Sequence, residues 1–178
     1  TNTVGVNTLL DAAKDHGIGR FLHVSTDEVY GDIEPGTFSV ESDELAPRNP
    51  YSASKAGGEL LVRAYHITHG LDTVITRGSN TYGPYQYPEK LIPFFITEAL
   101  DDRPLPVYGD GKQIRDWLYV RDHVTGIETA LLHGESGEVY NIAGETHQHN
   151  IDVTRMLLDQ LNKPESLIQH VPDREGHD

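Results

Sequence analysis

Short β-rich runs alternate with longer helical segments along this 178-residue chain, and that alternation constrains its fold more than any other feature. Strands separated by helices of about ten to twenty residues form βα units, which assemble into a mostly parallel sheet with helices on both faces. The expected helices are Val4 to Lys14, Pro50 to about His69, Leu91 to Leu100, Val120 to Leu132 and Ile151 to Leu161, and the expected strands are Phe21 to Ser25, Asp72 to Thr76, Leu105 to Tyr108 and Glu138 to Ile142. The predicted fold class is therefore α/β.

The helix expected from Pro50 is the best-defined element, because signals mark both of its ends. Proline stands in the first turn, where its missing N–H is not needed, and Gly70 follows the last residue, where a left-handed conformation is common. The apolar stripe expected on this helix consists of Ala53, Ala56, Leu60, Leu61 and Ala64. The segment from Gly31 to Asn49 is rich in proline, glycine and acids, and it predicts an irregular loop.

The charge balance argues against several kinds of partner and site. Fourteen basic residues stand against 28 acidic ones, a formal net charge of -14, and such a surface repels phosphate backbones, so no nucleic-acid partner is expected. A small anionic ligand is still compatible with this charge, because a few focused cations override the mean field. Cysteine is absent, which excludes disulfides, thiolate zinc sites and a cysteine nucleophile.

No membrane partner is expected either. No run approaches the ~20 consecutive apolar residues that cross a bilayer, and no basic segment followed by an apolar one suggests secretion. We therefore expect a soluble, acidic, cytoplasmic domain.

The readable strands do not complete a doubly wound sheet. Only about four strands are readable, and no glycine-rich phosphate loop follows any of them. A doubly wound domain binds its ligand where the strand order reverses, between two halves of the sheet. We expect that an N-terminal half is missing from this sequence, which opens at Thr1 beside a helix, or that it lies on another piece.

A tyrosine and a lysine stand four residues apart at the start of the helix that begins at Pro50. Residues at i and i+4 share one face of a helix, so the Tyr51 phenol and the Lys55 ammonium project together. A nearby cation favours the phenolate and lowers the pKa of a phenol, which suits a tyrosine for moving a hydroxyl proton. The pattern also occurs by chance, and its structural alternative is an aromatic ring packed on an aliphatic stem.

Three polar residues follow the strand expected at Phe21 to Ser25. Thr26, Asp27 and Glu28 stand at the carboxyl end of a buried strand, where open α/β domains place their ligands. A hydroxyl and two adjacent carboxylates are an unusual choice for packing alone. The alternative is a turn or a helix cap made by Thr26 or Asp27. About twenty-five residues separate this motif from Tyr51, which allows the two to converge.

Together these motifs resemble the extended short-chain dehydrogenase/reductase family, and within it the 4,6-dehydratases of nucleotide-activated glucose such as dTDP-glucose. The segments that carry the resemblance are Ser25-Thr26-Asp27-Glu28-Val29-Tyr30-Gly31, Pro50-Tyr51-Ser52-Ala53-Ser54-Lys55-Ala56, Ser79-Asn80-Thr81-Tyr82-Gly83-Pro84-Tyr85, Pro88-Glu89-Lys90-Leu91-Ile92-Pro93, Leu105-Pro106-Val107-Tyr108-Gly109, Gln113-Ile114-Arg115-Asp116-Trp117-Leu118-Tyr119-Val120, Tyr140-Asn141-Ile142 and Asp173-Arg174-Glu175-Gly176-His177-Asp178. The chain departs from the family pattern at Thr81, where a second asparagine is usual, and at Glu175, where proline is usual.

The resemblance implies a partial Rossmann-like doubly wound parallel sheet and part of a smaller substrate-binding lobe. Residues 1–80 would form the C-terminal half of the NAD-binding domain and carry the catalytic motifs. Residues 81–178 would form mainly the substrate-binding lobe, with returning Rossmann segments. The N-terminal βαβ half, with its glycine-rich NAD loop, and the C-terminal tail of the family would be absent, so that the chain alone would be inactive.

The activity implied is that of an NAD-dependent lyase, which dehydrates a nucleotide-diphospho-glucose to the 4-keto-6-deoxy sugar and recycles its NAD in place. Tyr51, tuned by Lys55 and assisted by Thr26, would remove the proton of the C4 hydroxyl. Glu28 would remove the C5 proton, and Asp27 would protonate the leaving C6 hydroxyl. The alternatives are an epimerase or decarboxylase of the same superfamily, which the acid pair disfavours, and a silent fragment that serves as a binding or assembly module.

Binding residues follow from the same resemblance. Substrate contacts are expected from Asn80, Glu89, Lys90, Leu91, Pro106, Val107, Tyr108, Arg115, Asn141, Arg174 and His177, and cofactor contacts with NAD from Thr1, Tyr51, Lys55 and Thr81. Lys90 and Arg115 would neutralise the diphosphate, and Tyr108 would stack on the base.

No metal is expected, although two histidine pairs have ligand-like spacing. His147 with His149, and His66 with His69, each lack a third ligand placed by the sequence. A homodimer is expected by resemblance, with the helices at Val4 to Lys14 and Pro50 to His69 packing against their partners.

Overall fold

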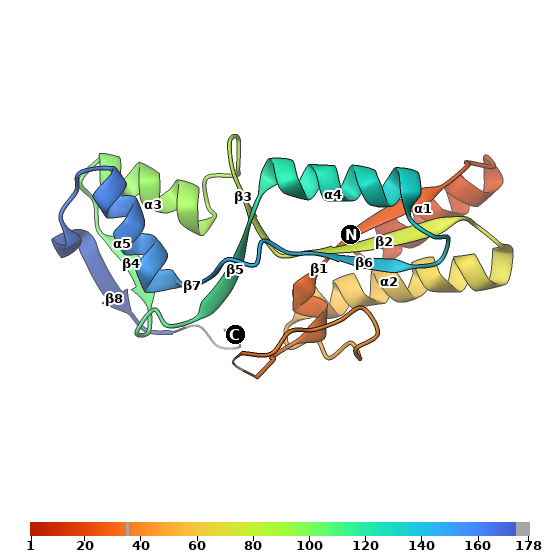
Figure 1. The fold of residues 1–178 in the computed structure, drawn as a ribbon, viewed down its shortest axis with the longest axis horizontal. Coiled ribbons are helices and arrows are strands. Elements are labelled where there is room, and N and C mark those ends of the chain that lie inside the picture. Colours follow the sequence, from red (N-terminus) through yellow and green to blue (C-terminus); the bar gives the residue numbers. More distant parts are fainter. Residues whose placement is uncertain (35, 174–178) are drawn as a thin grey trace. The chain divides into compact units, whose positions relative to one another are not determined.

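The computed structural model describes residues 1–34 and 36–173, and these residues fold into two compact units (Figure 1). The first unit combines residues 1–79 with residues 121–143, and the second combines residues 80–120 with residues 144–173. The chain therefore leaves the first unit after Ser79, returns to it for a helix and a strand, and leaves it again. Each unit has its own strands and its own core.

The first unit is built on a parallel sheet covered by helices. Its strands are β1 (Phe21–Thr26), β2 (Thr73–Gly78) and β6 (Val139–Ile142), in the order β1-β2-β6, and its helices are α1 (Val4–Asp15), α2 (Pro50–His69) and α4 (Val120–His133). Helices α1 and α2 pack on one face of the sheet, and α4 lies on the other (Figure 1). The α/β class predicted from the alternation of strands and helices is thus confirmed.

Both ends of α2 lie where the sequence predicts them. Asn49 caps the helix: its Oδ1 accepts the Ser52 N–H at 2.9 Å, while Ser52 Oγ accepts the Asn49 N–H at 3.3 Å. This reciprocal pair satisfies two backbone donors that a helix start leaves free. Gly70 closes the helix in the left-handed conformation, with φ 67°.

The apolar stripe expected on α2 is wrong in part. The buried residues are Ser52, Ala56, Gly58, Glu59 and Val62, whereas Ala53, Leu60 and Ala64 are exposed. The helix buries a partly polar face because Glu59 pairs with Arg77 of β2. It also approaches the chain before α1 closely, since a Cβ at Gly58 would lie 2.7 Å from the Asn2 carbonyl oxygen. Spacing of apolar residues alone therefore misplaces the buried face.

The second unit has two small groups of strands and two helices. The strands β3 (Asn80–Tyr82), β5 (Ile114–Tyr119) and β7 (His147–His149) form one sheet, β4 (Leu105–Tyr108) pairs with β8 (Ile168–Val171), and the helices are α3 (Leu91–Leu100) and α5 (Asn150–Gln160), followed by the short 3₁₀ helix η2 (Glu165–Leu167). All strand pairs here are parallel except β5 with β7. Phe95, Leu105 and Leu158 form the centre of this unit's core.

The expectation of about four strands is wrong, because the described residues contain eight. The strands that were not expected are β3, β5, β7 and β8. Strands β3 and β7 are three residues long, and β7 reads His-Gln-His, with no apolar residue to mark a buried face. Strand β5 carries Arg115 and Asp116 in its middle, a pattern that predicts a loop as readily as a strand. Their pairing is fixed by tertiary contacts rather than by local propensity.

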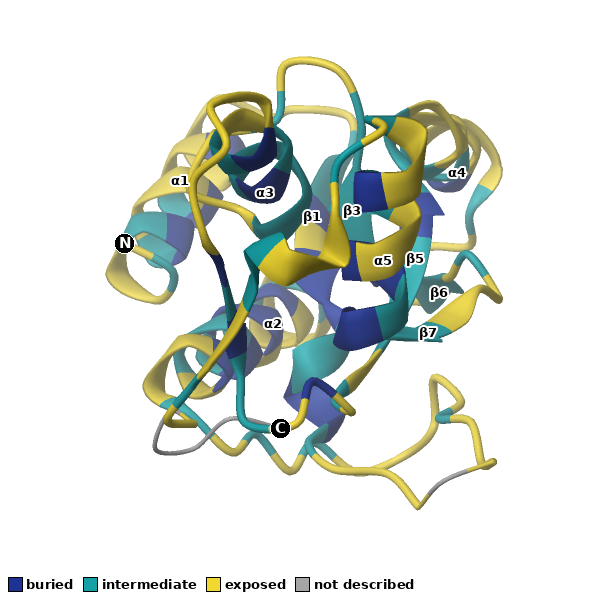
Figure 2. Cartoon of the chain, turned by 90° about the vertical axis from the view of Figure 1, so that its left-hand side faces the viewer, coloured by how far each residue is buried: buried dark blue, intermediate teal, exposed yellow. Residues whose placement is uncertain are grey.

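Exposed positions dominate the outer sides of the helices (Figure 2). Helices α3 and α5 each have buried residues, such as Phe95 and Leu158, on the side that packs against the other helix. Within the described ranges, no helix combines the length and the apolar character that crossing a membrane requires.

Candidate active site

The motif after β1 forms a single 3₁₀ turn, η1 (Asp27–Tyr30), at the carboxyl end of the strand. Thr26 caps this turn: its Oγ1 accepts the Glu28 N–H at 3.4 Å and donates to Asp27 Oδ1 at 3.3 Å. Gly31, with φ 77°, ends it. The helix cap considered as an alternative is therefore real. It also serves the functional interpretation, because it fixes the two acidic residues at the edge of the sheet.

The structure brings this turn and the start of α2 together. Thr26 forms a hydrogen bond with the Tyr51 phenol, and the charges of Glu28 and Asp27 act on that phenol. Thr26 is buried, the two carboxylates are half-buried, and Tyr51 is 50% exposed, so the group faces solvent on one side. Thr26 thus bonds Tyr51 directly, and Asp27 and Glu28 lie near enough for their charges to act on its phenol.

The fifth expected catalytic residue, Lys55, forms its hydrogen bond with the backbone of β1. Its Nζ donates to the Val24 carbonyl at 2.6 Å. The pKa of Tyr51 is raised rather than lowered, first by burial and then by the charges of Glu28 and Asp27, while the Thr26 hydrogen bond lowers it. Burial also lowers the pKa of Lys55 itself. Burial and the two acids thus set the direction of the Tyr51 pKa shift, which is opposite to the direction expected from the i, i+4 spacing.

Asn49 is a residue of this site that the sequence analysis missed. Besides capping α2 through Oδ1, it donates from Nδ2 to Glu28 Oε2 at 3.2 Å. The signal available in the sequence was an asparagine directly before Pro50, a typical N-cap position. Nothing in the sequence indicated its second partner, which lies 21 residues earlier.

A buried ionic network behind the site was missed as well. The Arg77 guanidinium donates from Nη2 to Glu59 Oε2 at 2.7 Å and from Nε to the same carboxylate, and both side chains are almost completely buried. Its Nη1 donates to the Tyr30 hydroxyl at 2.7 Å, and its Cζ lies 4.7 Å from the centre of the Tyr30 ring. Arg77 therefore connects β2 with α2 and with the end of η1.

Asn141, expected to contact substrate, belongs to the same network. Its Oδ1 accepts the Tyr30 hydroxyl at 2.7 Å, and its Nδ2 donates to the Ser39 carbonyl at 3.1 Å. Its backbone N–H donates to Glu41 Oε1 at 2.9 Å. In this structure the side-chain amide is thus engaged with the protein on both sides.

The other expected binding residues lie mainly in the second unit. Asn80 and Thr81 lie on β3, Glu89 and Lys90 precede α3, Leu91 begins it, Pro106, Val107 and Tyr108 lie on β4, and Arg115 lies on β5. The Val107 side chain is buried in the core, so only its backbone is available to a ligand. Arg115 Nη1 donates to the Ile114 carbonyl at 2.9 Å. Thr1 is exposed in the first unit, and Arg174 and His177 lie outside the described residues.

The histidine pairs do not form metal sites in the part of the chain that the structure describes, where no group of three or more histidine, aspartate or glutamate side chains is arranged to hold a metal ion. His66 Nδ1 faces the Leu71 carbonyl at 3.0 Å, and His149 Nδ1 faces the Lys112 carbonyl at 2.8 Å. These rings are bonded to the backbone instead.

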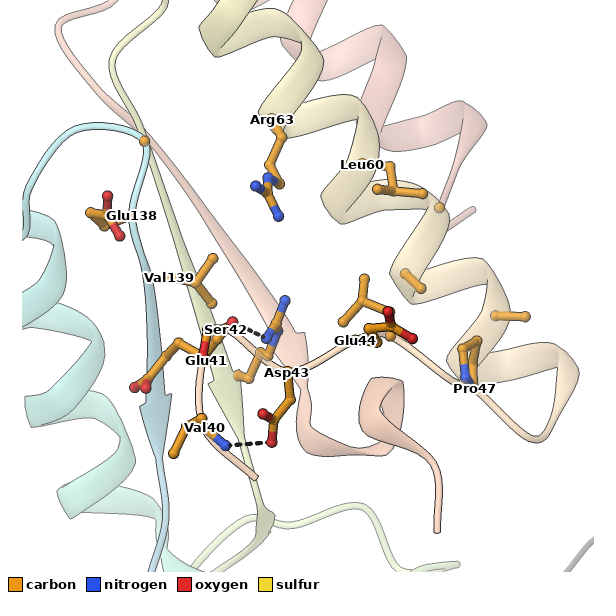
Figure 3. A pocket seen from close by; sticks show the side chains of 16 residues that line it. Val40, Glu41, Ser42, Asp43, Glu44, Pro47, Leu60, Arg63, Glu138 and Val139 are labelled. Atoms are coloured by element: carbon orange, nitrogen blue, oxygen red, sulfur yellow. Dashed lines mark hydrogen bonds between the residues drawn. The ribbon is translucent and has the colours of Figure 1, made fainter. Parts of the chain in front are cut away.

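A pocket of about 1120 Å³ lies beside α2 (Figure 3). The loop from Val40 to Pro47 lines one side and α2 the other, and Arg63 points into it from the helix. Neither Tyr51 nor the acidic pair lines this pocket.

Comparison with known proteins identifies the family. The family model described as "NAD dependent epimerase/dehydratase family" matches residues 1–143. The chain belongs to this family. The matched range includes the segments that carry Thr26, Asp27, Glu28 and Tyr51.

Within the epimerase/dehydratase family, the chain shares about half of its residues with several dehydratases. It is 56% identical to a dTDP-glucose 4,6-dehydratase from an Actinoplanes strain, and 53% identical to the low-salt glycan biosynthesis protein Agl12 of Haloferax volcanii, in each case over all 178 residues. Those matches cover 55% and 57% of the relatives, so the chain spans a little over half the length of the curated relatives it matches.

Solved structures of the same family have the same fold over this part of their chains. The crystal structure of DesIV, a dTDP-glucose 4,6-dehydratase from Streptomyces venezuelae with NAD and TYD bound, matches 100% of this chain and 55% of its own with a TM-score of 0.97 and 52% identity. A UDP-glucuronic acid 4-epimerase from Bacillus cereus, in complex with UDP-glucuronic acid and NAD, matches 99% of this chain and 56% of its own with a TM-score of 0.92 and 32% identity. The fold is thus common to both classes, whereas sequence identity is higher with the dehydratase.

Proposed function

We propose that this chain is the catalytic part of an NAD-dependent dTDP-glucose 4,6-dehydratase, a lyase that forms the 4-keto-6-deoxy sugar. The observation that carries the proposal is the meeting of Tyr51 with Thr26, Asp27 and Glu28 at the carboxyl end of β1. An epimerase needs a base for one hydroxyl proton and a hydride acceptor. A dehydratase also needs a base and an acid for elimination, and the consecutive carboxylates supply both.

Tyr51 removes the proton of the C4 hydroxyl, and Thr26 hydrogen-bonds the same oxygen. The raised pKa of Tyr51 means that the phenol requires positive charge nearby before it acts as a base. NAD, when bound, supplies the hydride acceptor and a positively charged ring in this region. Lys55 adds a second cation on the same face of α2.

Glu28 removes the C5 proton, which the C4 ketone has made acidic, and Asp27 protonates the C6 hydroxyl so that it leaves as water. The hydride that bound NAD accepts from C4 would return to C6, and Glu28 would return its proton to C5, so the complete reaction involves no net oxidation. Asp27 must be protonated for this step. The adjacent Glu28 favours that state, because two like charges at short range resist joint ionisation.

The residues present fit the cofactor. In the described chain Lys55 donates to a single acceptor, the Val24 carbonyl, so two of its three N–H groups are available to ribose hydroxyls. Tyr51 stands one turn away on the same face and is half exposed. Lys55 and Tyr51 would therefore hold the nicotinamide riboside of NAD, with Thr1 and Thr81 as further contacts.

The second unit would supply the substrate site. Lys90 and Arg115 would neutralise the diphosphate, and Tyr108 would stack on the thymine ring. Asn80, Glu89, Leu91, Pro106, the Val107 backbone, Asn141, Arg174 and His177 complete the proposed set.

The test uses the protein expressed from its complete reading frame, with dTDP-glucose and NAD. A 4-keto product that absorbs in alkali supports the proposal. Asp27→Asn should abolish that product while C4 oxidation stays detectable. Formation of a C4 epimer alone would overturn the proposal in favour of an epimerase, and no turnover at all would favour a binding or assembly module.

The assembly follows from the same proposal. The first unit forms part of the NAD-binding domain, and a cytoplasmic homodimer forms through α1 and α2. Apolar side chains on these helices are exposed in the single chain, among them Val4, Leu9 and Ile67. Light scattering of the complete protein should give twice the mass of one chain.

A further inference from the structure

Asn49 links the two elements that carry the proposed chemistry. Its Oδ1 accepts the Ser52 N–H at 2.9 Å, which fixes the orientation of the side-chain amide and turns Nδ2 toward η1. The Ser52 side chain is completely buried and its Oγ also bonds the Asn49 carbonyl at 3.1 Å. Position 49 is therefore held from the backbone and from the side chain.

The free end of this amide reaches the proposed C5 base. Asn49 Nδ2 donates to Glu28 Oε2 at 3.2 Å, and this bond holds Oε2 while Oε1 is left to accept a proton. A neutral N–H orients the carboxylate without placing a cation beside it. The amide thus suits a carboxylate that must present one oxygen to a substrate proton.

Capping alone does not require this amide. Serine and aspartate cap helices about as well as asparagine. Aspartate has no N–H to donate, and serine is shorter, so neither reproduces both contacts. We propose that Asn49 is a positioning residue for Glu28: through its Nδ2 it orients the base that removes the C5 proton. This inference rests on the proposed dehydratase function.

The other charged groups around Glu28 do not replace this bond. Asp27 is its neighbour on η1, Tyr51 faces it from α2, and Lys55 donates to Val24. On the loop before α2, Arg48 pairs with Asp32 at 2.7 Å.

Two variants separate positioning from capping, and both are made in the protein expressed from its complete reading frame. Asn49→Ser keeps the cap and removes the amide, so kcat should fall about tenfold with KM unchanged. Asn49→Asp keeps the cap and places a second carboxylate against Glu28. The acidic limb of its kcat/KM profile should move about one unit to higher pH. Wash-in of solvent deuterium at C5 should slow in both variants relative to C4 oxidation.

The matched control is Asn162→Asp, which adds the same charge after α5, at a residue with φ 54° that aspartate also tolerates. Thermal unfolding should be the same in all four proteins, since each keeps its cap. If the wild type is active and the Asn49 variants match the control in pH profile and deuterium wash-in, the positioning role is wrong while the proposed function stands. If the wild type forms no 4-keto product, both fall.

Discussion

Two glutamates of the first unit differ in how the fold satisfies them. Glu59 is completely buried and receives its hydrogen bonds from the Arg77 guanidinium. Glu28 is half-buried at the edge of the sheet, and its hydrogen bond comes from the neutral Asn49 amide. The Glu59 carboxylate accepts at both oxygens from a buried cation, whereas the Glu28 carboxylate accepts at Oε2 from a neutral amide. The first serves the fold and the second suits catalysis.

The sharpest test of this contrast is Glu28→Gln. The variant should lose about 10²- to 10⁴-fold in kcat, because a general base is removed from the proposed elimination. Its free energy of unfolding should change by less than about 1 kcal/mol, since Glu28 is half-exposed and glutamine keeps the shape. Product formation and urea unfolding measure the two effects. A large loss of stability with activity retained would reverse the assignment.

Removing the cation from the buried Arg77–Glu59 pair should instead have its main effect on stability. Arg77→Met leaves Glu59 charged and unpaired, which should cost about 3–5 kcal/mol in the free energy of unfolding. The double variant Arg77→Met, Glu59→Leu should recover most of that loss, because it removes the uncompensated charge. Urea unfolding of the three proteins is the measurement. Equal destabilisation by the single and double variants would contradict this account.

His23 of β1 lies within reach of the Glu59 charge, so its titration tests the buried side of this contrast. Burial, and to a lesser extent the charge of Lys55, lower the pKa of His23 to about 4, although Glu59 opposes the shift. The unfolded chain therefore binds more protons than the folded one between about pH 4 and 6.5. Stability should fall as pH is lowered through that window, by up to about 3 kcal/mol.

His23→Gln should lose the fall in stability between about pH 6.5 and 4. The control His133→Gln, at the exposed end of α4, should keep that fall. Unfolding by urea at several pH values measures both. An unchanged slope in His23→Gln would mean that His23 is not the group responsible for the pH dependence in this window.

The elements that the sequence predicts correctly are those whose ends are marked by residues within the element or next to it. Helix α2 is bounded as expected because Pro50 and Gly70 act locally, and Thr26, Asp27, Glu28 and Tyr51 are found because their motifs are contiguous. The strands β7 and β8 depend on partners far away in the chain, and short polar runs do not reveal them.

The supporting contacts of the site are missed for the same physical reason. Asn49 reaches a carboxylate 21 residues away and Arg77 one 18 residues away. In each pair the two residues lie on different elements or at the cap of one, so neither helix nor strand periodicity in the sequence indicates that they meet. The direction of the Tyr51 pKa shift likewise depends on burial and on charges from another element.

The smallest expected effect comes from the hydroxyl that joins the buried pair to η1. Tyr30 accepts from Arg77 Nη1 and donates to Asn141 Oδ1, each at 2.7 Å, so Tyr30→Phe leaves a buried donor and a partly buried acceptor without this partner. The cost should be about 1–3 kcal/mol, because the ring and its packing remain. Glu59 stays neutralised in this variant, so the loss should be smaller than that of Arg77→Met. A loss as large as that of Arg77→Met would show that the Tyr30 hydroxyl, and not the guanidinium–carboxylate pair, is the main contact that holds η1 in place.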